Sequence, residues 1–287
     1  MNILYCGDKN IADGLIMSSL SLAAHSDEPL DIFILTAELD TPTRHCEALS
    51  DDFAEFLDAH IRSCDPRSSV RLFDITELFN AALPAANLET RFTPCCMLRL
   101  YADLVDEIPD RVLYLDNDVI CRRDFSGFYN ADLGDAPLAG VPDFYGRWFF
   151  SRGVARRDYL NSGVLLLDMK KIRADGLFCR CREMCATRQM FMPDQSAINK
   201  LSAKKKIMPR CYNEQRRQQK NTVFRHFTTT FRLFPTFHTV SVKPWQAEKM
   251  HDVLKIHEYD DLIAESGRLM AEYTSHWRRS GEAKNER

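Results

Sequence analysis

Residues 111–120 read Arg111-Val112-Leu113-Tyr114-Leu115-Asp116-Asn117-Asp118-Val119-Ile120, an apolar segment that is interrupted by two aspartates. The run of valine, leucine and tyrosine is typical of a short buried β-strand. Because strand side chains alternate between faces, Asp116 and Asp118 should point in the same direction. Buried carboxylates need a counter-charge, and two oxygen ligands at a strand end suit Mg²⁺ or Mn²⁺. The stretch therefore predicts a divalent metal site that also holds substrate phosphates, with a polar capping turn as the alternative.

The segments around this stretch alternate between strand and helix patterns. Apolar runs predict strands at 2–7, 30–36, 70–73, 112–115, 139–142 and 163–169. Apolar residues at three- and four-residue spacing predict helices at 11–24, 41–59 and 97–105. This order predicts an α/β fold with a Rossmann-like, mostly parallel sheet flanked by helices. The two aspartates then lie at the carboxyl end of a strand, where such sheets bind their ligands.

The composition is that of a soluble globular protein. The chain has 287 residues, of which 45% are hydrophobic and 28% are charged. A net charge of −3 argues against nucleic acid as a partner. No apolar run is long enough to cross a membrane and the N-terminus lacks a secretory signal, so we expect a cytoplasmic location. We expect a catalytic domain over residues 1–260 and a C-terminal helix with a polar tail over residues 261–287.

Ten cysteines are scattered along the chain. Cys179, Cys181 and Cys185 form a short cluster, but no Cys-x-x-Cys pair meets a second one at the spacing of a zinc site. In a helix, Cys181 or Cys185 would pack as a small hydrophobic side chain. We therefore expect reduced thiols and no structural zinc.

Several short motifs occur in an order that resembles glycosyltransferase family 8. They are Asp8 and Asn10 after the first strand, then Leu98-Arg99-Leu100, Leu113-Tyr114-Leu115-Asp116-Asn117-Asp118, Leu160-Asn161-Ser162-Gly163-Val164-Leu165-Leu166, Asp194-Gln195 and Lys243-Pro244-Trp245. The resemblance covers nearly the whole chain. It implies the GT-A fold, a retaining glycosyltransferase activity, a UDP-sugar donor and a divalent cation, as in bacterial lipopolysaccharide galactosyl- and glucosyltransferases and the glycogenins.

The resemblance also implies that Asp116, Asp118 and a histidine hold Mn²⁺ or Mg²⁺. Such a cation would bind the donor diphosphate and stabilise the charge that develops as UDP leaves. Two histidines compete for the third position. His226 is followed by an aromatic residue, as in the family, whereas His238 lies close to the family spacing before the Lys-Pro-Trp motif. We favour His226, which makes residues 229–242 an insertion.

Five further residues are implied to bind the donor. Lys243 would add a positive charge on the diphosphate, with a solvated loop lysine as the alternative. Asp8 and Asn10 would contact the base and the ribose, although both residue types are also common helix caps. Arg99 resembles the family arginine that reaches the donor sugar or phosphate, whereas a single helix arginine is otherwise usually on the surface. Asn117, between the two aspartates, belongs to the same donor set.

Four residues are implied to line the donor sugar. Asn161, Asp194 and Gln195 would contact it, and Asp143 matches a family acid near the sugar hydroxyls, with a turn after Pro142 as its alternative. Retention could use a weak nucleophile at Asp194 or Gln195 and a covalent intermediate. It could instead use attack by the acceptor from the leaving-group face. The pair of carboxylates that flanks the sugar in retaining glycosidases is not evident.

Acceptor and membrane contacts have weaker signals. Trp148-Phe149-Phe150 could form a mobile acceptor lid or a buried patch. Phe231, Phe234 and Phe237 could form an apolar stripe or a platform for a sugar ring. Trp277-Arg278-Arg279 suggests weak contact with the inner surface of a membrane, too slight for stable anchoring.

The expected function is transfer of glucose or galactose from UDP-hexose to a hydroxyl of a glycan, a lipid-linked saccharide or a cell-surface polysaccharide precursor such as lipopolysaccharide. Haloacid-dehalogenase-like phosphatases also carry Asp-x-Asp after an apolar strand, with the first aspartate as nucleophile, but their motif follows the first strand of the fold. A nucleotide-sugar binding protein without turnover is a further alternative. A nucleotidyltransferase usually carries a Gly-rich, basic N-terminal loop, which residues 6–9 match poorly.

Overall fold

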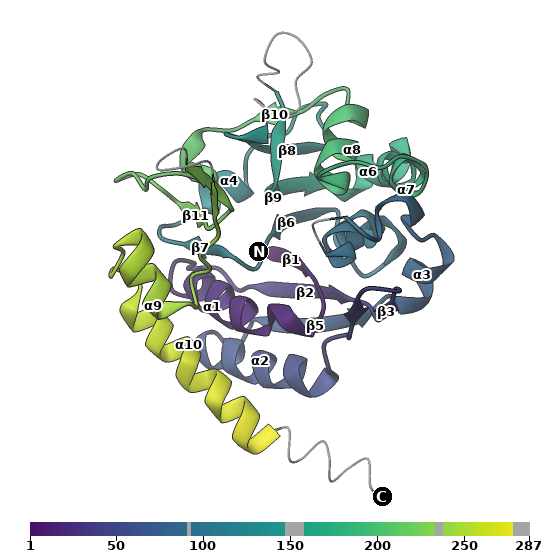
Figure 1. Ribbon diagram of the computed structural model, residues 1–287. Coiled ribbons are helices and arrows are strands. Elements are labelled where there is room, and N and C mark those ends of the chain that lie inside the picture. Colours follow the sequence, from purple (N-terminus) through teal and green to yellow (C-terminus); the bar gives the residue numbers. More distant parts are fainter. Residues whose placement is uncertain (91–92, 147–157, 233–237, 278–287) are drawn as a thin grey trace, which may run out of the picture.

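A seven-stranded sheet forms the centre of the protein (Figure 1). The computed structural model describes residues 1–90, 93–146, 158–232 and 238–277. Across the sheet the strands are ordered β10 (Lys206–Ile207), β8 (Leu138–Pro142), β9 (Leu160–Asp168), β6 (Arg111–Leu115), β1 (Asn2–Cys6), β2 (Asp31–Thr36) and β5 (Ser69–Asp74). β9 runs antiparallel to β6 and β8, whereas the other pairings are parallel. The predicted α/β fold with a mostly parallel sheet is confirmed.

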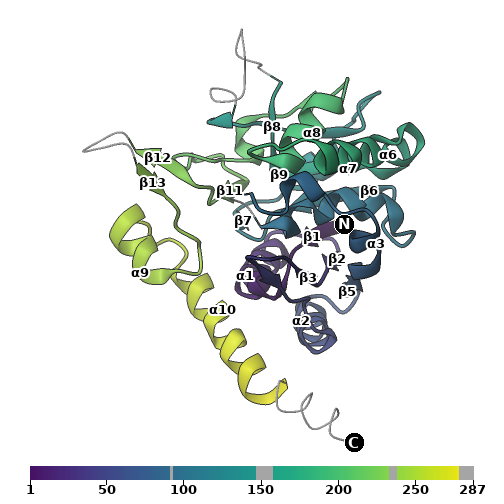
Figure 2. The ribbon, with the colours of Figure 1, turned by 45° about the vertical axis from the view of Figure 1, so that its right-hand side comes forward.

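Helices cover both faces of the sheet, because its strands carry apolar side chains on both sides (Figures 1 and 2). One core contains Ile3 and Tyr5 of β1 and is covered by α1 (Ala12–Ala23), α2 (Asp51–Cys64) and α10 (Asp260–Glu272). The other core contains Leu4 of β1 and is covered by α3 (Thr76–Ala81), the 3₁₀ helix η3 (Pro94–Leu104), α6 (Met169–Asp175), α7 (Leu177–Thr187) and α8 (Pro193–Leu201).

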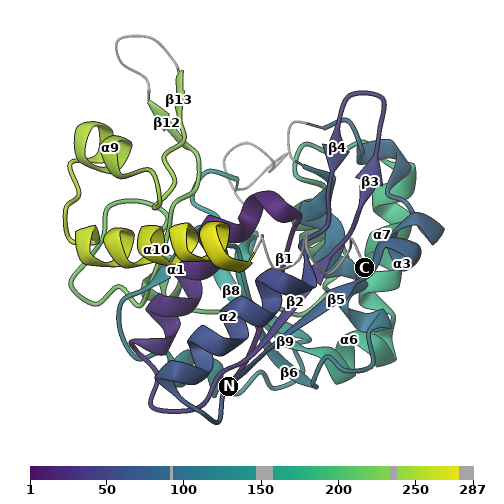
Figure 3. The same cartoon turned by 90° about the horizontal axis from the view of Figure 1, so that it is seen from below.

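The remaining elements are short. Three antiparallel pairs lie outside the main sheet: β3 (Leu39–Asp40) with β4 (His45–Cys46), β7 (Val119–Cys121) with β11 (Phe224–His226), and β12 (Thr230–Arg232) with β13 (His238–Val240). Figure 3 shows the hairpins β3–β4 and β12–β13 at the end of the sheet away from the N-terminus. The short helices are η1 (Lys9–Ile11), η2 (Ala85–Asn87), α4 (Ser126–Tyr129), η4 (Arg210–Tyr212), α9 (Ala247–Lys249), and the π-helical η5 (Met250–Leu254) and η6 (Tyr273–Trp277).

The predicted helix at 41–59 is wrong in its first half. This region begins with the β3–β4 hairpin, in which Leu39 pairs with Cys46. The helix begins only at Asp51, where the Ser50 hydroxyl accepts a hydrogen bond of 3.3 Å from the backbone N–H of Phe53 and caps the first turn. The predicted helix at 97–105 is the 3₁₀ helix η3, and β9 starts three residues earlier than predicted.

The C-terminal segment packs along the first helices of the chain. α10 lies against α1, and η6 lies against α2 (Figure 3). The division of the chain into residues 1–260 and 261–287 stays a prediction. Within the described residues, no helix has the length and apolar character needed to span a membrane. Several residues named above lie outside the described residues: Trp148, Phe149, Phe150, Phe234, Phe237, Arg278 and Arg279.

Candidate active site

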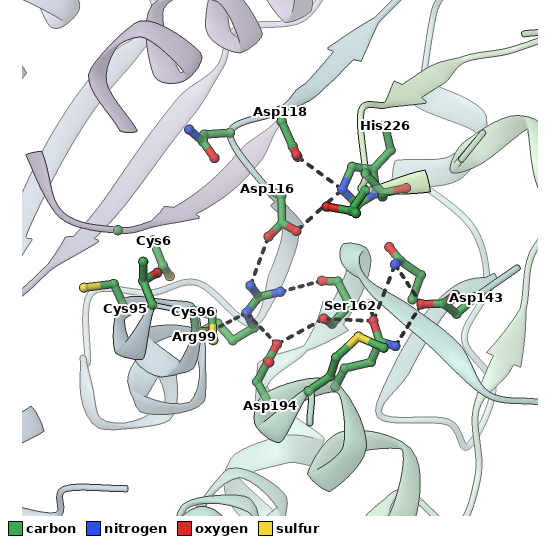
Figure 4. A pocket seen from close by; sticks show the side chains of 18 of the residues that line it. Cys6, Cys95, Cys96, Arg99, Asp116, Asp118, Asp143, Ser162, Asp194 and His226 are labelled. Atoms are coloured by element: carbon green, nitrogen blue, oxygen red, sulfur yellow. Dashed lines mark hydrogen bonds and ion pairs between the residues drawn. The ribbon is translucent and has the colours of Figure 1, made fainter. Parts of the chain in front are cut away.

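The two aspartates of the motif directly follow β6, at its carboxyl end. β7 comes next and pairs antiparallel with β11, so that His226 lies opposite Val119. Nε2 of His226 is 3.6 Å from Oδ2 of Asp116 and 3.1 Å from Oδ1 of Asp118 (Figure 4). One ligand atom from each of the three residues lies within 4.8 Å of the other two. The structure therefore brings the predicted aspartates together with the favoured histidine.

The competing histidine cannot be compared in the same way. The backbone of His238 lies in β13, opposite Arg232, but its side chain lies outside the described part of the structure. The strands β12 and β13 lie in the stretch between His226 and Lys243. The assignment of that stretch as an insertion stays a prediction.

The three side chains suit a divalent cation. Oδ1 of Asp118 is buried and makes no hydrogen bond, because its contact with the imidazole lacks hydrogen-bond geometry. Nδ1 of His226 lies 3.1 Å from the amide oxygen of Asn213, which can only accept, so Nδ1 carries the proton. In the neutral ring, the lone pair of Nε2 then faces the two carboxylates, which is the arrangement usual for a metal-bound histidine.

Gly163 makes room for this cluster. A Cβ atom at this position of β9 would lie 2.2 Å from Cε1 of His226 and 2.6 Å from Oδ2 of Asp116. The backbone also holds the aspartate directly, since the N–H of Asp116 donates to the Gly163 carbonyl at 2.8 Å. Gly163 thus allows β9, β6 and β11 to approach one another closely enough for their polar groups to meet.

Lys243 forms an ion pair with Asp118. Burial alone would raise the pKa of Asp118, but the positive charge of Lys243 holds it well below its usual value. Burial alone would lower the pKa of Lys243, but Asp118 raises it above its usual value. Both groups are therefore charged at neutral pH. Asn117 lies beside Gly14 of α1, where a Cβ atom would come within 2.5 Å of the Asn117 amide nitrogen.

Arg99 is buried at the centre of the site, not on the surface (Figure 4). Its Nη2 donates to Oδ1 of Asp116 at 3.0 Å, and its Nε lies 3.3 Å from Oδ2 of Asp194. Its Nη1 donates to the Ser162 carbonyl at 2.6 Å, and its guanidinium stacks 4.1 Å from the ring centre of Tyr114. The guanidinium thus joins Asp116 to Asp194 on α8.

The four residues expected around the donor sugar form one hydrogen-bonded network. Oδ2 of Asp143 accepts from Nε2 of Gln195 at 2.9 Å and from Nδ2 of Asn161 at 3.2 Å. Oδ1 of Asn161 accepts from Nδ2 of Asn213 at 2.9 Å, which connects the network to His226. Asp194 joins through Ser162, whose hydroxyl donates to Oδ2 of Asp194 at 3.0 Å.

Of the two residues expected at the base and ribose, only one lines the pocket. Asp8 is buried and lines the pocket, and its Oδ1 also accepts from the backbone N–H of Asn10 at 3.1 Å as the cap of η1. Asn10 is exposed and is not among the residues that line the pocket. Its amide donates to Oδ2 of Asp8 at 3.1 Å, so it acts here through the aspartate.

A pocket of about 730 Å³ unites these groups (Figure 4). Eleven of the thirteen residues proposed from the sequence line it: Asp8, Arg99, Asp116, Asn117, Asp118, Asp143, Asn161, Asp194, Gln195, His226 and Lys243. Sequence reasoning missed the contribution of Asn213, Ser162 and Gly163. The Leu-Asn-Ser-Gly motif did contain two of them, but no local pattern pointed to Asn213.

The family model for glycosyl transferase family 8 matches residues 2–249. The chain belongs to glycosyl transferase family 8. The resemblance inferred from the motifs is therefore confirmed.

Two curated relatives illustrate the family. Lipopolysaccharide 1,2-glucosyltransferase of Escherichia coli (strain K12) is 26% identical over 225 residues, which cover 74% of this chain and 62% of that protein. Probable glycosyl transferase Gly of Streptococcus gordonii is 32% identical over 128 residues, or 42% of this chain and 18% of that protein. The chain thus spans less than two thirds of either relative.

Solved structures of this family share the fold. The galactosyltransferase LgtC, in complex with donor and acceptor sugar analogs, aligns with a TM-score of 0.65 at 20% identity, covering 93% of this chain and 96% of that one. The glycosyltransferase GlyE of Streptococcus pneumoniae TIGR4 aligns with a TM-score of 0.57 at 18% identity, covering 92% and 63% of the two chains. The predicted GT-A fold is confirmed.

Proposed function

We propose that this member of family 8 is a metal-dependent, retaining glycosyltransferase that moves glucose or galactose from UDP-hexose to a hydroxyl of a glycan or lipid-linked saccharide. The observation that carries the proposal is the buried Oδ1 of Asp118, which has no hydrogen-bond partner and faces Asp116 and His226 in the wall of the pocket. Two relatives named as lipopolysaccharide glucosyltransferases support a cell-surface saccharide as the acceptor.

Asp116, Asp118 and His226 would hold Mn²⁺ or Mg²⁺. When bound, the cation supplies Lewis acidity and positive charge to the leaving diphosphate. Lys243 would exchange its ion pair with Asp118 for the diphosphate, because its raised pKa keeps the ammonium charged at neutral pH. Arg99 would fix the carboxylates of Asp116 and Asp194 relative to each other, so it acts as a positioning residue.

Asp143, Asn161 and Gln195 would orient the donor sugar. Their amides and carboxylate already bond to one another, so sugar hydroxyls can replace these bonds without leaving a buried polar group unpaired. Asp8 would bind the base or ribose, with Asn10 supporting its carboxylate.

Of the two routes to retention, we favour attack by the acceptor from the leaving-group face. The carboxylate of Asp194 is held by Arg99 and by the Ser162 hydroxyl, which makes it a weak nucleophile. Intact-mass measurement after mixing the protein with donor alone tests this choice. We expect no glycosyl adduct on the chain, and an adduct on Asp194 or Gln195 would establish the covalent route.

The first test of the proposed function is UDP release from a panel of UDP-sugars without acceptor. We expect slow release from UDP-glucose or UDP-galactose with Mn²⁺, loss of release with EDTA, and recovery on renewed addition of Mn²⁺. The Asp118→Asn variant should lose release, because a neutral amide is a much poorer ligand for a hard cation.

Two outcomes would contradict the proposal. UDP binding in calorimetry, with no sugar transfer to any saccharide acceptor tried, would indicate a nucleotide-sugar binding protein without turnover. Release that is equally fast in EDTA and in Asp118→Asn would remove the metal from the mechanism.

A further inference from the structure

A second group of metal-ligand atoms lies at the wall of the same pocket. Asp8, Cys46 and Cys95 are all buried, and one ligand atom from each lies within 4.8 Å of the other two. The three come from distant parts of the chain: the cap of η1, strand β4 and the first turn of η3. Asp8 and Cys95 line the pocket, whereas Cys46 is buried and does not line it. Figure 4 shows Cys95 on the side of the pocket opposite Asp143.

We propose that Asp8, Cys46 and Cys95 form a binding site for a thiophilic divalent cation such as Zn²⁺, and that this cation competes with the donor for Asp8. The competition between cation and donor at Asp8 rests on the proposed function. Binding of the cation to Asp8, Cys46 and Cys95 does not. The site is separate from the one at Asp116, and its ligands are of a different type. Two sulfurs favour a softer cation than Mn²⁺ or Mg²⁺.

The distances fit tetrahedral zinc after small movements. Zinc bonds sulfur at about 2.3 Å, which puts two thiolates on one tetrahedral ion about 3.8 Å apart. The three ligand atoms lie within 4.8 Å of one another, so tetrahedral coordination needs at most small side-chain movements. Each thiol would give its proton to solvent as its sulfur binds the metal. Three protein ligands leave the fourth position open towards the pocket, where water can complete the coordination.

The charge balance also favours a cation here. Asp8 is only 5% exposed, and within the described part of the chain it forms no ion pair with a basic side chain. Its hydrogen bonds come from the backbone and amide of Asn10, and the Cys46 sulfur lies within 4.8 Å of a carboxylate oxygen. A buried carboxylate is costly without a compensating charge, so a bound cation would stabilise it.

A different pair of cysteines provides a matched control. All ten cysteines are free, and Cys181 and Cys185 of α7 are as deeply buried as Cys46 and Cys95. They lie one helical turn apart, but no carboxylate or imidazole joins them in a third-ligand position among the described residues. A pair of buried thiols is thus present without the aspartate, and it should not bind a metal ion strongly.

The test uses Cd²⁺ as the probe, with the full chain under a phosphine reductant and without nucleotide. Cadmium–thiolate charge-transfer absorption reports sulfur ligation and is silent for the cluster at Asp116, which has no sulfur. We expect saturation at one equivalent in the wild type. Affinity should fall by more than about tenfold in Cys46→Ala and Cys95→Ala, since loss of even an outer-shell partner costs about 10–100-fold. The double variant Cys181→Ala/Cys185→Ala should behave like the wild type.

A second titration tests the competition at Asp8. UDP affinity is measured with saturating Mn²⁺, with and without Zn²⁺, in the wild type and in Cys46→Ala. Zn²⁺ should weaken UDP binding in the wild type. In Cys46→Ala, about tenfold more Zn²⁺ should be needed for the same effect. Cys46→Ala should bind UDP normally without Zn²⁺, which also shows that the variant is folded.

Each result has one meaning. Full cadmium absorption in both single-cysteine variants, or its loss in the control double variant, would overturn the metal site. Cadmium binding as expected with equal zinc sensitivity of UDP binding in both proteins would overturn the competition. Failure of the protein to bind UDP at all would contradict the proposed function while leaving the cadmium result as the test of the metal site.

Discussion

Gly163 sets the spacing between Asp116 and His226 although it contributes no side chain. It lies in β9, next to β6, and a Cβ atom there would overlap Cε1 of His226 at 2.2 Å and Oδ2 of Asp116 at 2.6 Å. The first of these neighbours is the ring of a buried histidine, which has little space to move. Any larger residue at this position must therefore displace a predicted metal ligand.

We predict that Gly163→Ala weakens Mn²⁺ binding by more than about tenfold, since a displaced ligand should cost at least as much as a lost outer-shell partner. Free Mn²⁺ measured by electron paramagnetic resonance gives the affinity. Gly267→Ala is the matched control, because a Cβ atom there meets nothing within 4 Å and alanine favours the helix. Equal Mn²⁺ affinity in the two variants would remove Gly163 from the metal site.

The two histidines can be separated in the same assay. We predict that His226→Ala weakens Mn²⁺ binding strongly, because Nε2 of His226 faces both aspartates with its lone pair. His238→Ala serves as its control and should leave the affinity close to that of the wild type. The reverse order would assign the third ligand to His238 and would remove the reason for treating residues 229–242 as an insertion.

Single residues differ in how far the sequence could predict them. Asp116 and Asp118 were evident, because two carboxylates after an apolar strand have few structural explanations. Asn213 was not, because an isolated asparagine before Glu214 carries no local signal. Its role arises from its contacts with His226 and Asn161, 13 and 52 residues away in the chain. The position of Cys46 beside Cys95 was equally unpredictable from the sequence. The two cysteines meet only because the β3–β4 hairpin brings Cys46 close to Cys95.

At the scale of elements, strands were easier to predict than the boundaries of helices. β1, β2 and β6 consist mainly of apolar residues, whereas the region from Thr41 onward offers a Thr-Pro pair that also opens helices. Pro42 instead lies in the turn between β3 and β4, and Ser50 supplies the real cap of α2. The hairpin was missed because two-residue strands are too short to show any periodicity.

Asp168 ends β9 and caps α6, so its substitution tests how much the helix cap contributes to stability. Its Oδ1 accepts from the backbone N–H of Lys171 at 2.9 Å, and its Oδ2 lies 2.9 Å from Nζ of Lys171. Burial alone would raise the pKa of Asp168, but these contacts with Lys171 lower it. We predict that Asp168→Ala lowers the free energy of unfolding by about 1 kcal/mol at pH 7, as is typical for a lost N-cap.

The effect should depend on pH in a defined direction. Because the folded state lowers the pKa of Asp168, the unfolded chain binds the proton more readily. The stabilisation is therefore present above the unfolded value of about 3.9 and is lost as the pH falls below it. Denaturant unfolding at pH 7 and near pH 3 measures the difference. Asp175→Ala, at the other end of α6, should cost nothing at pH 7 because a negative charge there opposes the helix dipole.

At the scale of the whole molecule, the pocket and the C-terminal helix lie on different parts of the fold. The pocket lies beyond the carboxyl end of β6, whereas α10 packs along α1 and belongs to the core that contains Ile3 and Tyr5. Tyr273, just after α10, meets Phe53 edge to face with ring centres 5.3 Å apart. These contacts tie the C-terminal segment to the sheet without touching Asp116, Asp118 or His226, so stability and ligand binding should separate in a variant of α10.

Leu269 of α10 provides that variant, since its side chain is 0% exposed within the same core. We predict that Leu269→Ala lowers the free energy of unfolding by about 2–5 kcal/mol, through lost burial and the cavity left behind. UDP affinity of the folded protein should stay unchanged. Leu78→Ala, at a leucine that is 38% exposed, is the control and should change stability by less than about 0.5 kcal/mol. Denaturant unfolding followed by circular dichroism should show one transition in both variants, because α10 shares its core with the sheet. A separate early transition in Leu269→Ala, with UDP binding retained through it, would show instead that the segment after residue 260 folds as its own unit.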